Sequence, residues 1–314
     1  MKMKMKHLTI LSVAALMAGA LLTTSCSEDE LSSQSVINVS KTEKNDFDKW
    51  LDNNYLEPYN IRFVYRYEEV LSDFGYYTVP ADYNMSIEMA HIVKYICIDS
   101  YNEVAGVDFT RTYFPKEFFL IGEWEYNNAG TIILGTAEGG KKVLLSGVNY
   151  FDEYKKSIIT LTQKYLKTIH HEFTHILNQT RPMPTDFQFV SGDTYIGSEW
   201  NKAPFNDENY YLGHGHITDY SQQEYKEDFA DMMSMYICYP ESQWNAWLEQ
   251  AAKSSVDNEY GIDAKERILQ KLSIVSRYMK DNYNIDIKNL RDVIQRREAE
   301  VMAGKVSLTD LTIK

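Results

Sequence analysis

The longest run of regularly spaced apolar residues lies in the middle of the chain. Its members recur at steps of three and four residues, the spacing that brings side chains onto one face of an α-helix. They are Phe151, Tyr154, Ile158, Leu161, Tyr165, Ile169, Phe173 and Ile176. Pro182 ends the pattern because proline cannot continue a helix. The sequence therefore predicts an amphipathic helix here, with its apolar face turned towards a core.

Further helices are predicted on both sides of this one. Near the start, Ser40-Lys41-Thr42-Glu43 has the form of a capping box and precedes apolar residues at helical spacing up to Tyr55. A second helix is expected over roughly Ser86–Glu103. After Pro240, apolar stripes predict three more helices, over Gln243–Ala252, Asp263–Asn282 and Asp286–Ala303.

Short segments rich in aromatic and β-branched residues predict strands. They cover Arg62–Glu68, Phe118–Tyr126, Thr131–Leu134 and Lys142–Leu145, the last two joined across Glu138-Gly139-Gly140. The order is then strand, helix, several strands and the long helix. This order indicates an α+β fold followed by a helical C-terminal part.

The long predicted helix carries His171-Glu172-Phe173-Thr174-His175. Residues four apart share a helix face, so the two imidazoles can reach one metal ion, while Phe173 points to the core. Glu172 is rotated by about 100° from His171, close enough to reach a water on the metal without being a ligand. This HExxH pattern is typical of zinc hydrolases.

A catalytic zinc takes three protein ligands, so a third is needed. The extended pattern HExxHxxGxxH fails, because Asn178 and Arg181 occupy its last two positions. Downstream, Ser221–Glu224 resembles a capping box that would start a helix, with Phe229, Met232, Met233 and Tyr236 as its core face.

Glu227 and Asp231 lie four apart on another face of that predicted helix. Glu227 is the predicted metal ligand, and Asp231 is predicted to accept a hydrogen bond from a ligand histidine and fix its tautomer. Two alternatives stay open. Glu224 and Asp228 have the same spacing, and His214 or His216 could supply a nitrogen ligand instead.

His171 and His175, followed by Glu227-Asp228-Phe229-Ala230-Asp231, resemble the gluzincin metallopeptidases, and the second segment is similar to that of their anthrax-lethal-factor-like branch. The resemblance implies that Tyr220, seven residues before Glu227, helps to stabilise the tetrahedral oxyanion. It also implies a zincin-like catalytic domain over residues 43–240 and a helical subdomain over 241–314. In such domains the last strand before the zinc helix is an edge that pairs with substrate, here Lys141–Ser146.

The start of the chain has the features of a processing segment. Three lysines precede an apolar stretch, Leu8–Leu22, that is short for a membrane span. Leu22-Thr23-Thr24-Ser25-Cys26 then resembles a loose bacterial lipobox. Residues 1–25 are therefore interpreted as a lipoprotein signal peptide, Cys26 as the site of lipid attachment, and residues 26–42 as a flexible tether.

Charge and cysteine content narrow the class of partner. Without residues 1–25 the chain has 29 Lys and Arg against 45 Asp and Glu, a formal charge of −16. Such an acidic protein is not expected to bind nucleic acid. Cys97 and Cys238 form no disulfide framework, and the sequence leaves open whether they pair or are buried thiols.

Together the residues predict a hydrolase that uses Zn2+ to cleave an amide, most simply in a peptide or protein substrate. The whole mature chain resembles the zinc metallohydrolase lipoproteins associated with SusC/SusD-type importers. That resemblance implies an outer-membrane lipoprotein exposed at the cell surface. A non-peptide amide hydrolase and a zinc-containing surface protein that only binds substrate are the alternatives. Trp200, Tyr210, Tyr211 and His214, in the long segment before Tyr220, are candidates for substrate contact.

Overall fold

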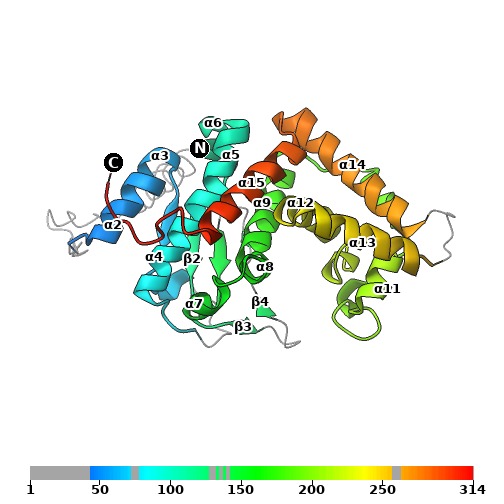
Figure 1. The fold of residues 1–314 in the computed structure, drawn as a ribbon, viewed down its shortest axis with the longest axis horizontal. Helices are drawn as coiled ribbons and strands as arrows, with labels where there is room; N and C mark the ends of the chain where they lie inside the picture. Colours follow the sequence, from blue (N-terminus) through cyan, green and yellow to red (C-terminus); the bar gives the residue numbers. More distant parts are fainter. Residues whose placement is uncertain are drawn as a thin grey trace, which may run out of the picture. The chain divides into compact units, whose positions relative to one another are not determined.

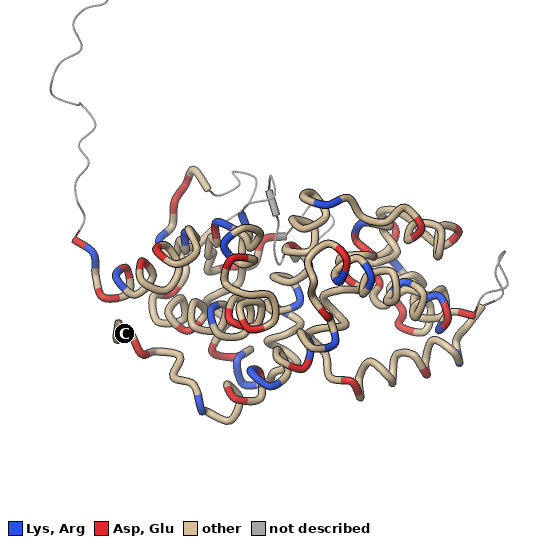
Figure 2. Tube along the Cα trace, turned by 90° about the horizontal axis from the view of Figure 1, so that it is seen from above, with Lys and Arg blue, Asp and Glu red and all other residues tan. Residues whose placement is uncertain are grey.

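The computed structural model describes residues 43–71, 78–126, 132–133, 137–138, 142–256 and 263–313 (Figure 1). The chain divides after residue 43, and every described helix and strand belongs to the unit formed by residues 44–314. The expected signal peptide, Cys26 and the tether lie outside the described residues. Among the described helices, none combines the length and apolar character needed to cross a membrane. Acidic and basic residues are interspersed along the described trace (Figure 2).

A small mixed sheet forms one part of this unit. Its order is β1 (Arg62–Val64), β2 (Glu117–Leu120), β6 (Lys142–Leu145) and β5 (Ala137–Glu138). The first three strands are parallel, and β5 runs antiparallel to β6. Alternate strand residues such as Phe63, Phe118 and Val143 are buried in the main core, so the sheet is held by packing against helices.

Three predictions about the strands are corrected. The segment predicted as one strand over Phe118–Tyr126 splits into β2 and β3 (Glu125–Tyr126), and β3 pairs antiparallel with β4 (Ile132–Ile133) in a separate sheet. The predicted hairpin between β4 and β6 is therefore wrong. The prediction that Lys141–Ser146 forms the sheet edge is also wrong, because β5 covers the outer side of β6. The short β5 could not be recognised between two segments of higher β-propensity.

The N-terminal helices are confirmed with shifted ends. The first, α2 (Asp46–Leu51), begins three residues after Glu43, which is not helical. Asn45 accepts a hydrogen bond from the Asp48 backbone N–H, and the Asp48 side chain accepts one from the Asn45 N–H. The helix is thus capped at Asn45, and residues 40–42 of the predicted cap at Ser40–Glu43 lie outside the described residues. A π-helical turn (Asp52–Leu56) and α3 (Glu57–Tyr59) continue it.

The predicted helix over Ser86–Glu103 is confirmed and is slightly longer. It consists of α4 (Tyr83–Ile92), a π-helical segment (Val93–Ile98) and α5 (Asp99–Ala105). Gly106, with φ of 87°, then allows the turn into α6 (Val107–Tyr113), and α5 and α6 pack against each other.

The central helix is interrupted once. The predicted stripe begins in α7 (Phe151–Tyr154), and the chain then restarts at Ser157, whose hydroxyl caps α8 (Ile158–Leu161). A π-helical segment (Thr162–Leu166) leads into α9 (Lys167–Thr180), the helix of the HExxH pattern. The apolar stripe is buried over most of its length, as the spacing predicts.

The long segment between α9 and Tyr220 has short helical elements. It contains α10 (Phe187–Val190), a 3-10 turn (Gly197–Glu199) and α11 (Glu208–Gly213). A 3-10 turn over Tyr220–Gln222 precedes α12 (Tyr225–Cys238). The predicted capping box is wrong here, because the Ser221 hydroxyl bonds Thr218 and Glu224 makes no side-chain cap.

The three C-terminal helices are confirmed as α13 (Glu241–Ser254), α14 (Ala264–Tyr283) and α15 (Ile287–Met302). Asp263 and Asp286 cap the last two. Helices α14 and α15 both pack against α12, and α12 lies beside α9 (Figure 1). The α12 side chains predicted to face the core are buried, apart from Tyr236, which is partly so. The described unit is thus a helix-rich mixed fold with a small sheet.

Candidate metal centre

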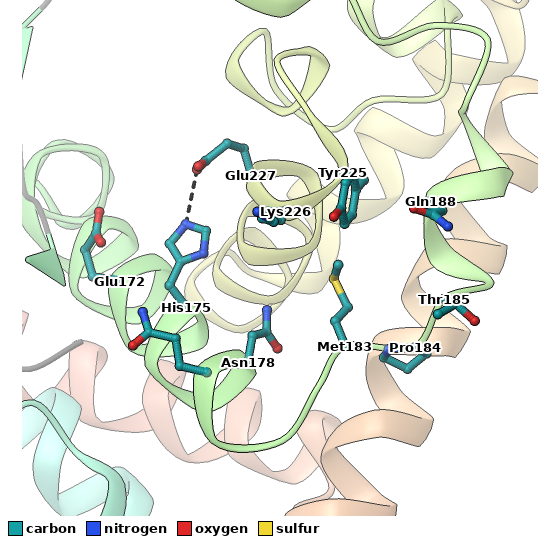
Figure 3. Close-up of a pocket in the computed structure, with 11 residues that line it drawn as sticks. Glu172, His175, Asn178, Met183, Pro184, Thr185, Gln188, Tyr225, Lys226 and Glu227 are labelled. Carbon is teal, nitrogen blue, oxygen red and sulfur yellow. Dashed lines mark hydrogen bonds and ion pairs between the residues drawn. The ribbon is translucent and has the colours of Figure 1, made fainter. Parts of the chain in front are cut away.

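Three side chains from two adjacent helices converge on one point. The Nε2 atoms of His171 and His175 are 3.0 Å apart, and Oε2 of Glu227 lies 3.0 Å from the first and 3.1 Å from the second. Among the described residues, these three form the group whose donor atoms lie close enough together to hold one metal ion. Helix α9 contributes the pair and α12 the carboxylate (Figure 3, which labels His175 and Glu227).

The spacing of these atoms fits zinc. In a tetrahedral site with zinc–ligand bonds of about 2.0–2.1 Å, the ligand atoms stand about 3.3 Å apart. The observed separations of 3.0–3.1 Å are close to this value. Two imidazole nitrogens and one carboxylate oxygen are also a donor set that zinc hydrolases use, with a fourth position left open.

The histidines face this point because the opposite side of α9 is anchored in the core. Phe173 is fully buried and packs against Tyr101 and Phe114, with ring centroids 4.9 and 4.8 Å away. A helix with one face fixed in this way turns residues at the other angular positions outward. The apolar stripe read from the sequence therefore sets the direction of the two imidazoles.

A buried carboxylate fixes the orientation of His171. Nδ1 of His171 lies 2.7 Å from Oδ1 of Asp231, so Nδ1–H donates there and Nε2 is left free for a metal. Lys167 Nζ lies 2.9 Å from the same oxygen, and the Thr218 hydroxyl donates to the other one. Asp231 is fully buried, and all three partners hold it in place.

The electrostatics of the centre favour a cation. Burial alone would lower the pKa of His171, but the Asp231 carboxylate, with help from Glu227 and Glu172, raises it to about 9. Burial opposes ionisation of Glu227, and hydrogen bonds from the two histidines outweigh it and lower the pKa of that carboxyl. Carboxylates that attract a proton to this point also attract a divalent cation.

Glu172 lies beside the centre at one end of a cavity of about 500 Å³. The cavity is also lined by His175 and Glu227, so it opens directly onto the metal position. Glu172 and His175 project from the same stretch of α9 towards it (Figure 3). The carboxylate predicted to act as a base is therefore next to the space that a substrate could enter.

Tyr220 also lies next to the centre. Its ring centroid lies 5.9 Å from that of His171, and its hydroxyl interacts with Glu227. Burial, reinforced by the Glu227 carboxylate, raises the pKa of Tyr220, so its hydroxyl keeps its proton. Trp200 packs edge-on against Tyr220 with centroids 5.0 Å apart. Tyr220 can thus donate a hydrogen bond close to the metal position.

The alternative ligands are engaged elsewhere. Asp228 is fully buried and lies 2.6 Å from Lys271 Nζ and 2.8 Å from the Tyr195 hydroxyl. His216 is buried within 3.5 Å of the same carboxylate, and its Nε2 contacts Thr194. Glu224 occupies the N-cap position of α12.

His214 does not approach the centre either. Its ring stacks on Tyr210, with centroids 4.0 Å apart, and its Nδ1 donates to the Tyr210 carbonyl. Tyr211 packs against the main core. Of the four aromatic candidates for substrate contact, the one that the structure brings to the centre is Trp200, through Tyr220.

Sequence reasoning missed the groups that hold Asp231 and Asp228. Lys167 precedes His171 by four residues, so its place on the same helix face was available from spacing. Thr218 and Lys271 gave no comparable signal, because each reaches α12 from another segment. Cys97 and Cys238, whose state the sequence left open, are buried free thiols.

Comparison with known proteins identifies the class. Residues 40–288 match the model of a family described as "Putative zinc-binding metallo-peptidase". The match covers most of the chain, so the protein belongs to this family. The cofactor of the family is zinc, as the donor set indicates.

A solved structure supports the same conclusion. A crystal structure from Bacteroides caccae ATCC 43185, described as a "putative zinc-binding metallo-peptidase", is 36% identical with a TM-score of 0.71. The alignment covers 88% of this chain and all of that one. A comparison with curated proteins found no match. The helix-rich fold with a small, largely parallel sheet is thus similar to that of a protein described in the same words as the family.

Proposed function

We propose that the protein is a zinc-dependent peptidase of gluzincin type with a zincin-like catalytic domain, in which His171, His175 and Glu227 hold the metal. The observation that carries the proposal is the convergence of their three donor atoms within 3.1 Å, with Glu172 at the adjoining cavity. A zinc held only for structure needs no open position and no carboxylate beside it.

The side chains around the centre have complementary roles. Bound zinc supplies Lewis acidity, which acidifies a water and polarises the scissile carbonyl. Glu172 accepts the water proton and delivers it to the leaving amine. Tyr220, which keeps its proton, donates a hydrogen bond to the oxygen that gains negative charge. Asp231 keeps His171 in the tautomer that presents Nε2.

We place the substrate along β5, the strand at the sheet edge. Two observations support this placement: among the described strands β5 has a partner on one side only, and it lies against α9. An extended peptide could add to that edge by backbone hydrogen bonds and bring an amide to the centre.

The test is a Glu172→Gln variant incubated with a diverse peptide mixture, with cleavages read by mass spectrometry. The variant should retain zinc and lose cleavage, while Glu249→Gln, at an exposed position on α13, should cleave as the parent does. Full activity in the Glu172 variant would refute the mechanism. No cleavage by the parent, with zinc bound, would favour the non-peptide amide hydrolase or the binding role.

We further propose that a lipid on Cys26 anchors the protein in the outer membrane, with the catalytic unit at the cell surface beside a SusC/SusD-type importer. The support is the charged and apolar start of the chain and its similarity to a lipobox. Labelling of cells with a fatty-acid analogue should mark the protein and fail to mark a Cys26→Ala variant. Equal labelling of both would exclude attachment at Cys26.

A further inference from the structure

The cavity beside the metal centre has a distinct composition on the side away from Glu172. Its wall there comes from the end of α9, the segment that follows, α10 and the start of α12. The residues are Asn178, Met183, Thr185, Gln188, Tyr225 and Lys226. Amide and hydroxyl groups predominate, and the charged group among these six is the ammonium of Lys226.

Lys226 has no ionic partner among the described residues. It is exposed, and its Nζ lies 5.8 Å from the ring centroid of the neighbouring Tyr225. Figure 3 shows Lys226 on α12 between His175 and Tyr225, with Gln188 beyond Tyr225. Other lysines of the described residues do form ion pairs, for example Lys155 with Glu88 and Lys202 with Glu199. A free ammonium at this wall is available to a ligand.

Asn178 adds a second unmatched group. Its Oδ1 atom is buried and has no hydrogen-bond partner in the part of the chain that the structure describes, although the residue lines the cavity one turn after His175. Asn178 can rotate its amide to present either a donor or an acceptor. A polar group buried without a partner is costly, so a ligand that reached it would gain a hydrogen bond.

The charge of the cavity changes sign when the metal is held. Its lining has two carboxylates, Glu172 and Glu227, against one ammonium. A divalent cation reverses this balance and leaves a net positive wall. The cavity also includes the first three residues of α12, where the backbone N–H groups and the helix dipole favour an anion.

We propose that this cavity is the specificity pocket of the site and that it selects a carboxylate next to the scissile amide. Lys226 pairs with the carboxylate, and Asn178 and Gln188 hydrogen-bond the rest of the polar group. The carboxylate could belong to an Asp or Glu side chain or to the C-terminus of a peptide. The inference rests on the proposed function, because it places the selected group beside the peptide bond that is cut.

The experiment measures binding as well as cleavage. Zinc-loaded Glu172→Gln protein is titrated with acetylated peptides that differ at one position, Glu, Gln or Lys, each with an amidated and with a free C-terminus. The Glu peptide should bind roughly five- to tenfold tighter than the Lys peptide. Adding Lys226→Glu should reverse that order. Lys253→Glu, an equal charge change at an exposed position on α13, should leave it unchanged.

The two peptide ends separate the sources of the carboxylate. If affinity increases only for peptides with a free C-terminus, the pocket binds the chain-terminal carboxylate. If affinity increases for Glu in amidated peptides, the pocket binds the side-chain carboxylate. Equal affinity for all peptides, absence of binding, or an order unaffected by Lys226→Glu would overturn the proposal.

Cleavage by the otherwise unmodified protein decides the proposed function separately. Cleavage that depends on Glu172 but ignores charge would leave the peptidase standing and remove the pocket assignment. Binding that follows the charge of the peptide, without any cleavage, would leave the pocket assignment standing and remove the peptidase.

Discussion

Oδ1 of Asp231 lies 2.7 Å from Nδ1 of His171, and this contact joins the metal face of α9 to the buried face of α12. The Asp231 carboxylate is not exposed to solvent. It also forms an ion pair with Lys167 and accepts a hydrogen bond from the Thr218 hydroxyl. The proposed ligand is thus held by a group that cannot move without disturbing three partners.

Asp231→Asn should weaken zinc binding by about 10- to 100-fold, because an amide stabilises the required tautomer of His171 less well than a carboxylate. Competition with a metal chelator measures the loss. Asp186→Asn, which removes a carboxylate from a surface ion pair with Arg277, is the matched control and should bind zinc normally. Unchanged zinc affinity in the Asp231 variant would mean that this contact does not tune the site.

Lys271→Met should lower the free energy of unfolding by about 3–5 kcal/mol, because it leaves the Asp228 carboxylate buried without its cation. Both side chains are fully buried, and Nζ lies 2.6 Å from Oδ2. Urea unfolding of the single variant, of Asp228→Asn and of the double variant gives the coupling. The double variant should recover much of the loss. A Lys271→Met cost that is the same with and without Asp228 would rule out the coupling.

Glu298 should make stability depend on pH. It is buried, and burial raises its pKa to about 8, although Thr162 and Gln295 hydrogen-bond it. The unfolded chain loses this proton near the ordinary value of 4.5, while the folded protein keeps it. The free energy of unfolding therefore falls as the pH rises from about 4.5 to 8, by roughly a few kcal/mol, and this contribution is constant above that.

Glu298→Gln removes the titrating group while keeping its shape. Its denaturation midpoint should vary less with pH across this window than that of the parent protein, and the variant should be the more stable of the two above pH 8. If the denaturation midpoints of the two proteins changed with pH in the same way, Glu298 would not be the group responsible for the pH dependence.

Tyr220→Phe should reduce kcat by about a hundredfold with little change in KM or zinc content, because the hydroxyl acts on charge that develops in the transition state. Tyr210→Phe removes a hydroxyl from a ring that stacks on His214 away from the centre, and should have no effect. Equal rates for the Tyr220 variant and the parent would remove Tyr220 from the mechanism.

The sequence was most informative where a helix period and a chemical spacing coincide. The stripe through Phe173 located the helix of the HExxH pattern, and the spacing of four between His171 and His175 predicted that they share a face. The same spacing gave two candidate pairs on the next helix, Glu224 with Asp228 and Glu227 with Asp231. The structure brings the second pair to His171. These features depend on local geometry, so one segment of sequence contains them.

The rest depended on contacts between distant segments. The pairing of β6 with β2 and β5, rather than with β4, follows from how the whole sheet packs, and β5 is too short to show a pattern of its own. The helix cap at Asn45 was missed because Asn45 and Asp48 are three residues apart, as Ser40 and Glu43 are. Spacing alone could not decide between the two candidate caps. The ammonium of Lys271 reaches Asp228 across a gap in sequence that no periodicity reports.

Glu227 and Asp228 are neighbours on α12, one turned to the metal centre and the other to the interior. A helix cannot turn one side without turning the other, so the ion pair with α14 also sets the direction in which Glu227 points. A genetic screen for variants that lose zinc would consequently return substitutions in α14, a helix that supplies none of the proposed ligands. Sensitivity to mutation should therefore follow the contacts that connect α14 to α12, and not only the distance of a residue from the metal.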